Sequence, residues 1–396
     1  MKIMALLLAA ATLLSGCGEG VTVPIEVNIG QIADTERDKQ RVYTEETVEP
    51  DVRGAQEEAY PHSVSEEKYA YQTLDAETQS VYDEVLSCIL DHTKEVTVST
   101  LDPDIIARAY AAVYSDYGGL FWTNGYVYTK YTENDEITEL TFAPKYTMDL
   151  ESRREYQRKV DEAVEKILSD ISPSASDYEK SKYVYETLIR YADYDESAPN
   201  NQNILSVFLG KATVCQGYSC ATQYLLTQLG IESVIISGKA EGENHAWCAA
   251  LLDGAWYYID TTFGNSAYSG KKNGGSNYIN YSYLNITEEE LLRNHEFEWD
   301  FDLPTCITDR DNYFVQEGLY FADFDVDKLG ASLKDAWNDG APKENAMVSW
   351  KFSDPELYDQ VFEYFITKQH IGDWCRNLGT FRYVDDENKA VLMIGF

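Results

Sequence analysis

Two stretches of this sequence decide its fold: VCQGYSCATQYLLTQLG at residues 214–230 and HAWCAALLDGAWYYIDTT at residues 245–262. In the first, apolar side chains recur at helical spacing and Gly230 supplies a stop, which predicts a helix over residues 216–229. In the second, two strand-like runs flank an Asp-Gly pair at 253–254, which is typical of a tight hairpin turn. The two stretches together predict an α+β unit in which a helix precedes an antiparallel hairpin.

Cys215 falls at the N-terminus of the predicted helix. Unpaired backbone N–H groups and the positive end of the helix dipole gather there, and both favour a thiolate over a thiol. The same N–H groups can bind the oxyanion that forms when a nucleophile attacks a carbonyl. Cys215 is therefore a candidate nucleophile, although the commonest fate of a cysteine is burial as a small apolar side chain.

The hairpin turn fixes the register of its two strands. A two-residue loop at 253–254 places Trp247 opposite Asp260 and His245 opposite Thr262. His245 and Asp260 then become diagonal neighbours on one face, about 7–8 Å apart between backbones, whereas a slip of one residue would separate them. Cysteine, histidine and acid in this order match the parts of a thiol-based nucleophilic enzyme. Outside that chemistry, the pair would be a core histidine and a strand-end acid bonded to backbone N–H groups.

A zinc site is the main competing chemistry. Residue types that zinc binds occur as a C-x4-C and an H-x2-C pair, at Cys215, Cys220, His245 and Cys248. Positions five apart on a helix point about 140° apart, and positions three apart on a strand point to opposite faces. The spacing therefore predicts no metal site, and we expect no cofactor.

At these residues the chain resembles the bacterial secreted branch of the transglutaminase-like superfamily. The resemblance covers residues 176–265 and rests on KATVCQGYS around Cys215, on ENHAWCAALLDGAWYYIDTTFGN around His245 and Asp260, and on the upstream helix SKYVYETLIRYADYD. It implies a papain-like thiol fold in which Cys215 is the nucleophile, His245 the base and Asp260 the acid that orients the histidine. The family's second oxyanion donor does not map onto one residue of this chain.

The family's flanking aromatic positions map onto four residues that we expect to pack the core and form the cleft wall, namely Tyr218, Trp247, Trp256 and Tyr257. The implied reaction is acyl transfer from an amide through a thioester, and hydrolysis of peptide or cell-wall (peptidoglycan) amides is the leading prediction. Two alternatives stay open. One is a protein-cross-linking transglutaminase with an amine as acyl acceptor, and the other is a catalytically silent module that binds peptide or wall on the same fold.

The N-terminus, MKIMALLLAAATLLSGC, has the composition of a secretory signal peptide over residues 1–16. Its LSGC ending resembles the bacterial lipobox, which implies cleavage before Cys17 and attachment of lipid to the Cys17 sulfur. We therefore expect an extracytoplasmic protein anchored to a bacterial membrane at Cys17. The acid-rich residues 17–65 are expected to form a disordered tether, or in part a short strand at residues 21–29.

The whole chain has a net charge of −36. Such an anion repels nucleic acid, so none is expected as a partner. The charge suits solubility at a charged surface or, alternatively, a basic substrate such as a lysine-bearing peptide. The five cysteines other than Cys17 and Cys215 are odd in number and scattered, which predicts buried thiols rather than a disulfide framework.

The remaining sequence predicts three parts. Residues 66–175 form an N-terminal region with two helices, the second capped by Asp102 with Pro103 in its first turn, a hairpin over 125–144 and an amphipathic helix over 149–170.

Residues 176–309 form the catalytic core. Asp177 is expected to cap its first helix, and the Gly- and Asn-rich residues 266–280 form either a cleft rim or a plain surface loop.

Residues 310–396 form a separate α/β module, with helices at 325–337 and 354–366 alternating with strands and a final hairpin across 385–388. His370 and Cys375 lie close in sequence there, but no acid accompanies them, so we expect a binding or packing module without chemistry.

Overall fold

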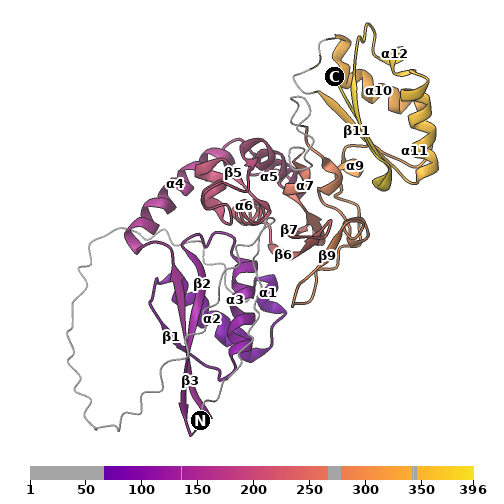
Figure 1. Cartoon of the computed structure of the whole chain (residues 1–396). Helices are drawn as coiled ribbons and strands as arrows, with labels where there is room; N and C mark the ends of the chain where they lie inside the picture. The colour runs from indigo at the N-terminus through magenta and orange to yellow at the C-terminus, as the bar shows by residue number, and fades with distance from the viewer. Residues whose placement is uncertain (1–66, 135, 266–277, 341, 343–345) are drawn as a thin grey trace.

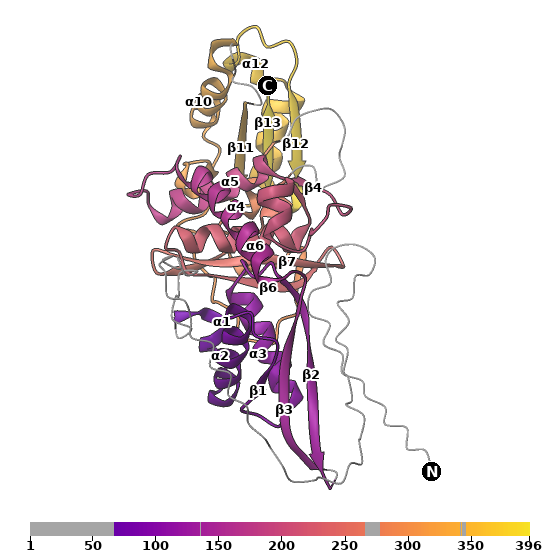
Figure 2. The same cartoon turned by 90° about the vertical axis from the view of Figure 1, so that its left-hand side faces the viewer.

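The computed structural model describes residues 67–134, 136–265, 278–340, 342 and 346–396. The predicted signal peptide, the lipid attachment site Cys17 and the tether lie outside these ranges, as do residues 266–277 of the candidate cleft rim. Within the described ranges, no helix has the length and apolar character needed to cross a membrane. The N-terminal region, the core and the C-terminal module follow one another along the molecule (Figures 1 and 2).

The N-terminal region packs helices against a long antiparallel hairpin. Its elements are α1 (Tyr69–Gln72), α2 (Ala76–Leu90), β1 (Val96–Val98), α3 (Pro103–Asp116), β2 (Thr123–Glu133), β3 (Glu136–Tyr146) and α4 (Leu150–Leu168). The strands lie in the order β1-β3-β2. The predicted cap is confirmed, because the Asp102 carboxylate accepts from the N–H of Asp104 and Pro103 stands in the first turn.

The core contains the two stretches that open the sequence. Its elements are α5 (Asp177–Tyr191), β4 (Asp193–Tyr194), η2 (Ser206–Gly210), β5 (Ala212–Thr213), α6 (Cys215–Gln228), β6 (Ser233–Ala240), β7 (Glu243–Leu252), β8 (Ala255–Ile259), α7 (Thr261–Gly264), η3 (Tyr281–Tyr283), α8 (Glu288–Leu291) and β9 (His295–Phe297). The central sheet is antiparallel throughout, in the order β8-β7-β6-β9.

The cap of α5 lies one residue earlier than predicted. Ser176 accepts from the N–H of Glu179, and the Glu179 carboxylate accepts from the N–H of Ser176, so these two residues form a capping box. Asp177 is instead the first helical residue. Its carboxylate accepts from the N–H of Asp253, which ties α5 to the β7–β8 turn.

The β7–β8 hairpin has the predicted register over its paired residues. Leu252 lies opposite Ala255, and the pairing runs to Cys248 opposite Ile259. Both turn residues at 253–254 have positive φ, as a type I′ turn requires. The expected pairs of Trp247 and His245 are not formed, because the chain leaves the strand after Ile259 to begin α7.

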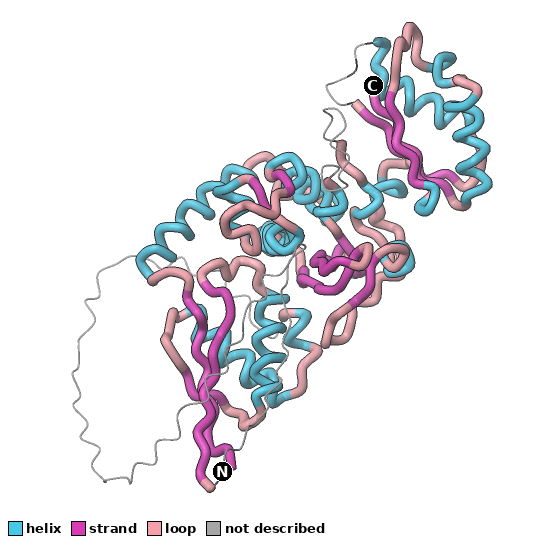
Figure 3. The backbone as a smooth tube through the Cα atoms, in the orientation of Figure 1, coloured by secondary structure: helices cyan, strands magenta, loops and turns pink. Residues whose placement is uncertain are grey.

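The C-terminal module has an α/β order, and its predicted helices and final hairpin are present. Its elements are α9 (Tyr313–Gln316), β10 (Tyr320–Phe321), α10 (Val326–Trp337), η4 (Asn338–Gly340), β11 (Met347–Phe352), α11 (Pro355–Phe362), η5 (Glu363–Thr367), α12 (Ile371–Trp374), β12 (Arg382–Asp386), η6 (Glu387–Lys389) and β13 (Val391–Gly395). Its strands lie in the order β10-β11-β13-β12, and Figure 3 shows strands running together with helices packed beside them.

The described residues contain two large clusters of buried apolar side chains and a small third one formed by Phe314, Val391 and Met393. The larger runs from Ala70 to Cys306 and includes residues of both the N-terminal region and the core. The smaller, from Phe321 to Ile394, belongs to the C-terminal module alone. The N-terminal region and the core therefore share one interior, whereas the C-terminal module has its own and contacts the core at its surface.

Candidate active site

The α6 helix places Cys215 at its first position. The residue before it, Val214, has an apolar side chain and makes no side-chain cap hydrogen bond. The helix ends as predicted, because Gly230 has a φ of 78° and the N–H of Ile231 returns to the carbonyl of Leu226, as in a Schellman motif. The first-turn N–H groups and the helix dipole therefore lie beside the Cys215 thiol.

Close packing explains why position 217 of the cysteine motif is a glycine. A Cβ at this position would lie 1.9 Å from the Oγ1 of Thr213 and 2.7 Å from the carbonyl oxygen of Asn201. The first turn of α6 thus packs directly on the backbone of the preceding loop, and only a residue without a side chain fits there.

His245 lies in β7 and contacts both other members of the predicted triad. Its Nε2 is 2.8 Å from the Oδ2 of Asp260, and its ring also hydrogen-bonds the Cys215 thiol. Because Nε2 faces Asp260, Nδ1 is the nitrogen left for Cys215. The three residues predicted from the sequence therefore converge in the order that thiol catalysis requires.

Asp260 uses both oxygens of its carboxylate. Oδ1 accepts from the N–H groups of Thr262 (2.9 Å) and Phe263 (3.0 Å), so Asp260 is the N-cap of α7. Oδ2 accepts from His245 and from a second histidine, His295, at 3.0 Å. The carboxylate is thus fixed by the cap on one side and by two imidazoles on the other.

His295 is the site residue that sequence reasoning missed. It begins β9, a short strand that pairs with β6 so that His295 lies opposite Ala240. No motif surrounds it, and 35 residues separate it from Asp260. The Glu-Gly pair at residues 241–242 was one usable signal in the sequence. In the structure both residues have positive φ and form a second two-residue turn, between β6 and β7. That turn predicts β6 beside β7, but nothing local predicts that β9 pairs with β6.

The buried charges stabilise one another. Burial alone disfavours the charged forms of His245 and Asp260. The Asp260 carboxylate and the Cys215 thiol nevertheless raise the pKa of His245. In return His245, with His295, holds the pKa of Asp260 below its usual range. Burial lowers the pKa of His295. These shifts favour a protonated His245, an ionised Asp260 and a neutral His295.

Aromatic rings surround these groups. The Trp247 indole lies 6.0 Å from His245 and meets His295 edge-on at 5.1 Å, and Phe263 contacts both imidazoles. Among the other expected wall residues, Tyr218 and Tyr257 are buried, and the half-buried Trp256 meets Tyr69 edge-on. These aromatic residues pack the core, but none of the four expected wall residues is among those that line the cleft beside Gln216.

The zinc ligands considered from the sequence do not converge. Cys220 contacts the amide of Gln216 and Cys248 donates to the carbonyl of Ser219. Within the described part of the chain, the group able to bind a metal is His245, Asp260 and His295, whose ligand atoms lie within 4.8 Å of one another. The cysteines of the described residues are buried and none forms a disulfide, as predicted.

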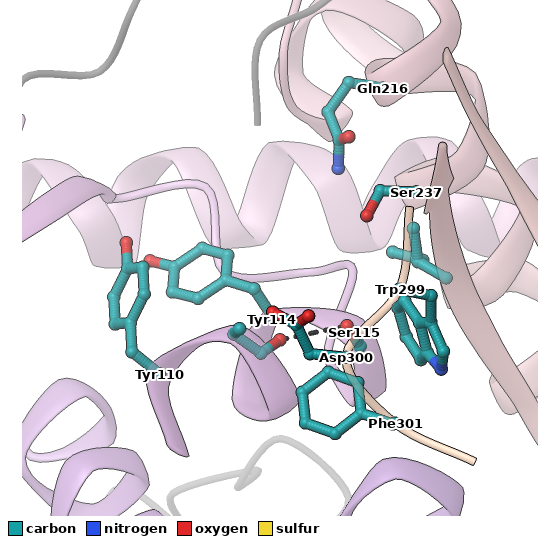
Figure 4. A pocket seen from close by; sticks show the side chains of 10 residues that line it. Tyr110, Tyr114, Ser115, Gln216, Ser237, Trp299, Asp300 and Phe301 are labelled. Carbon is teal, nitrogen blue, oxygen red and sulfur yellow. Dashed lines mark hydrogen bonds between the residues drawn. The ribbon is translucent and has the colours of Figure 1, made fainter. Parts of the chain in front are cut away.

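A cleft opens beside α6 (Figure 4). Four of its ten lining residues are aromatic, and the lining comes from α3, from β6, from residues 299–301 and from Gln216, which follows Cys215 in the chain. Cys215 itself is only 1% exposed. A substrate therefore reaches the sulfur only when neighbouring side chains move.

Comparison with known proteins agrees with this geometry. Residues 165–261 match the family model of the transglutaminase-like superfamily. This part of the chain is therefore similar to the transglutaminase-like superfamily, and its fold is α+β.

The similar individual proteins each match only part of this chain. The mouse (Mus musculus) protein Kyphoscoliosis peptidase is 23% identical over an aligned length of 127 residues, and the match covers 28% of this chain and 19% of the mouse protein. A TGase crystal structure covers 38% of this chain and 53% of its own, at 15% identity and a TM-score of 0.27. The match to the periplasmic domain of TgpA from Pseudomonas aeruginosa covers 32% of this chain and 55% of that domain's chain, at 15% identity and a TM-score of 0.20. The chain thus spans about a fifth of the curated relative that it matches.

Proposed function

We propose that this protein is a cysteine-nucleophile enzyme that hydrolyses amide bonds of peptides or of the cell wall. One observation carries the proposal: the thiol of Cys215, at a helix N-terminus, shares a hydrogen-bonded chain with His245 and Asp260. The aromatic lining of the cleft beside Gln216 suits an apolar side chain near the scissile bond.

The reaction follows from this geometry. The Cys215 thiolate attacks the amide carbonyl carbon, and N–H groups at the start of α6 stabilise the oxyanion. The C–N bond then breaks while protonated His245 gives its proton to the leaving amine, which leaves a thioester. Water attacks the thioester, His245 takes the proton of that water, and a carboxylic acid and the free thiolate result. Asp260 keeps the imidazole oriented throughout.

The place of the reaction is part of the same proposal. A lipid at Cys17 would hold the enzyme on the outer side of a bacterial membrane, where the cell wall lies within reach. The anionic character of the chain, with a net charge of −36, fits a basic substrate such as a lysine-bearing peptide.

Replacement of the nucleophile tests the proposal. A Cys215→Ala variant should lose at least about 10³-fold in amide cleavage of peptide and wall fragments, because no other group supplies the sulfur. Cys220→Ala is the matched control, since Cys220 lies in the same helix with its sulfur against Gln216 and should leave the rate within a few-fold. The released products are identified by mass spectrometry.

Two outcomes would contradict it. Full cleavage by the Cys215→Ala variant would show that another group performs the reaction. Products that contain an added primary amine in excess of free acid would identify a cross-linking transglutaminase instead of a hydrolase.

A further inference from the structure

The Oδ2 atom of Asp260 lies between two imidazoles. The distances are 2.8 Å to the Nε2 of His245 and 3.0 Å to the Nε2 of His295, and the side chains of all three residues are fully buried. The proposed reaction gives His245 a role and leaves His295 without one. A second histidine on a fully buried triad carboxylate is more than packing requires, since an apolar ring would fill the same space without a polar atom to satisfy.

Hydrogen bonding on the far side of His295 decides which nitrogen carries its proton. The Asn294 side chain lies between His295 and Tyr283, 2.8 Å from the Nδ1 of His295 and 2.9 Å from the Tyr283 hydroxyl. With the Asn294 oxygen toward Nδ1, both imidazole nitrogens would have to donate, and His295 would be a buried cation. Burial opposes that charge, and so do the His245 and Lys389 cations; together they outweigh the Asp260 carboxylate, which favours it, so the pKa of His295 is lowered.

The opposite amide orientation removes the conflict. Rotation of the Asn294 amide by 180° exchanges its oxygen and nitrogen and moves no other atom. The Asn294 NH₂ then donates to Nδ1 and its oxygen accepts from the Tyr283 hydroxyl, which makes Nε2 the protonated nitrogen of a neutral His295. That proton points at Asp260, and every polar group in the chain from Tyr283 to Asp260 then has a partner.

We propose that His295 is a positioning residue that donates its Nε2 proton to Asp260, holds the carboxylate ionised and turned toward His245, and so extends the site to a Cys–His–Asp–His tetrad. The inference rests on the proposed function, because it assigns His295 a part in activating Cys215. Asn294 and Tyr283 set the tautomer of His295. In this arrangement the cap of α7 fixes one oxygen of Asp260, and the two histidines fix the other.

The test measures how readily iodoacetamide alkylates Cys215 in the full chain between pH 5 and 9, with mass spectrometry to follow this cysteine alone. The variants are His295→Phe, which keeps a ring and removes both nitrogens, and His295→Gln, whose amide can still donate to Asp260. Circular dichroism and the melting temperature establish that each variant is folded.

We expect wild-type Cys215 to react already at mildly acidic pH, as a thiolate–imidazolium pair does. His295→Phe should lower the rate at neutral pH about 10-fold and move the acidic limb of the profile to higher pH, because a less firmly held Asp260 stabilises the imidazolium less. His295→Gln should restore most of the wild-type profile. If His295→Phe does not fold, Asn294→Leu takes its place, with a smaller shift in the same direction.

Three outcomes would overturn the inference, and they differ in what else they affect. A folded His295→Phe variant with the wild-type profile, or a His295→Gln variant as impaired as His295→Phe, would leave the triad intact and show that His295 only packs. A rise in melting temperature with Zn²⁺ that is lost in His295→Phe would assign the cluster to a metal instead. A wild-type Cys215 that reacts like an unactivated thiol would also overturn the proposed function.

Discussion

At the scale of single residues, the site depends on the carboxylate of Asp260 performing two tasks. One oxygen caps α7, and the other accepts from the two histidines. The first task is structural and any good acceptor performs it, whereas the second requires a negative charge opposite protonated His245. The two tasks can be separated by a change that keeps the cap and removes the charge.

Asp260→Asn is that change. The amide oxygen can still accept from the N–H groups of Thr262 and Phe263, so we expect a folded protein. Activity should fall about 10⁴-fold, because a neutral amide neither stabilises the imidazolium nor selects its tautomer. The measurement is kcat/KM for amide cleavage, alongside the melting temperature.

A second buried aspartate supplies the control. Asp311 bonds to Arg310 and Gln316 away from the site, so Asp311→Asn should cost stability and leave kcat/KM nearly unchanged. Equal losses of activity in the two variants would show that Asp260 acts only through the fold.

At the scale of secondary-structure elements, the start of α6 depends on close contact with the loop before it. Glycine inside a helix normally costs about 0.5–1 kcal/mol relative to alanine. At position 217 this cost is accepted because a side chain would overlap Thr213 and the backbone of Asn201. The contact fixes where the helix begins and hence where Cys215 lies.

Gly217→Ala should therefore destabilise the protein by about 2 kcal/mol or more, despite the better helix propensity of alanine. Alkylation of Cys215 should slow as well, since the first turn of α6 must shift. Chemical denaturation measures the first effect and mass spectrometry the second.

The matched control is Gly372→Ala in α12, where a Cβ would meet nothing within 4 Å. It should be neutral or slightly stabilising. A Gly217→Ala variant as stable as this control would mean that the loop before α6 yields easily.

At the scale of the whole molecule, the C-terminal module contacts the core close to the histidine cluster. Arg293 donates to the carbonyl of Asn388, Lys351 pairs with Glu290, and the Tyr281 and Tyr313 rings stack at 3.7 Å. Next to these contacts the Lys389 ammonium is buried 3.8 Å from the centre of the Tyr283 ring. Its nitrogen has no hydrogen-bond partner among the described residues.

Lys389→Met should make the protein more stable at pH 7 and lose this advantage at alkaline pH. Burial lowers the pKa of Lys389 to about 8, below its value of 10.5 in the unfolded chain. Below pH 8 the folded state bears the full cost of a buried charge, and between pH 8 and 10.5 that cost disappears as the folded state releases its proton. Lys389→Met removes the cost of burying the charge but also loses a cation–π attraction of about 2 kcal/mol. The free energy of unfolding should therefore rise by about 1 kcal/mol at pH 7.

Denaturant unfolding at pH 7 and at pH 10 measures this difference. Lys328→Met is the control, because Lys328 also lies over an aromatic ring of the module, at 5.0 Å from Phe321, but is exposed. A pH-independent effect of Lys389→Met would mean that the ammonium is solvated in the folded state.

The sequence by itself determined the elements that follow from local rules. Helical spacing and Gly230 define α6, and the Asp-Gly turn sets the β7–β8 register from Leu252 opposite Ala255 to Cys248 opposite Ile259. These features depend on residues close together in the chain, so composition and spacing contain enough information to predict them. Even there the predicted cap of α5 was wrong by one residue. Ser176 and Glu179 form two reciprocal hydrogen bonds, which Asp177 alone cannot match.

Features that depend on residues far apart in the chain are defined only by the tertiary structure. β9 reaches β6 through pairing across some 55 residues, and this pairing brings His295 onto the carboxylate that His245 already shares. The same holds for Lys389, which reaches Tyr283 from the far end of the chain. Long-range pairing is selected by the packing of the whole interior, which no local pattern contains. The sequence therefore predicted a triad, and the fold added its fourth member.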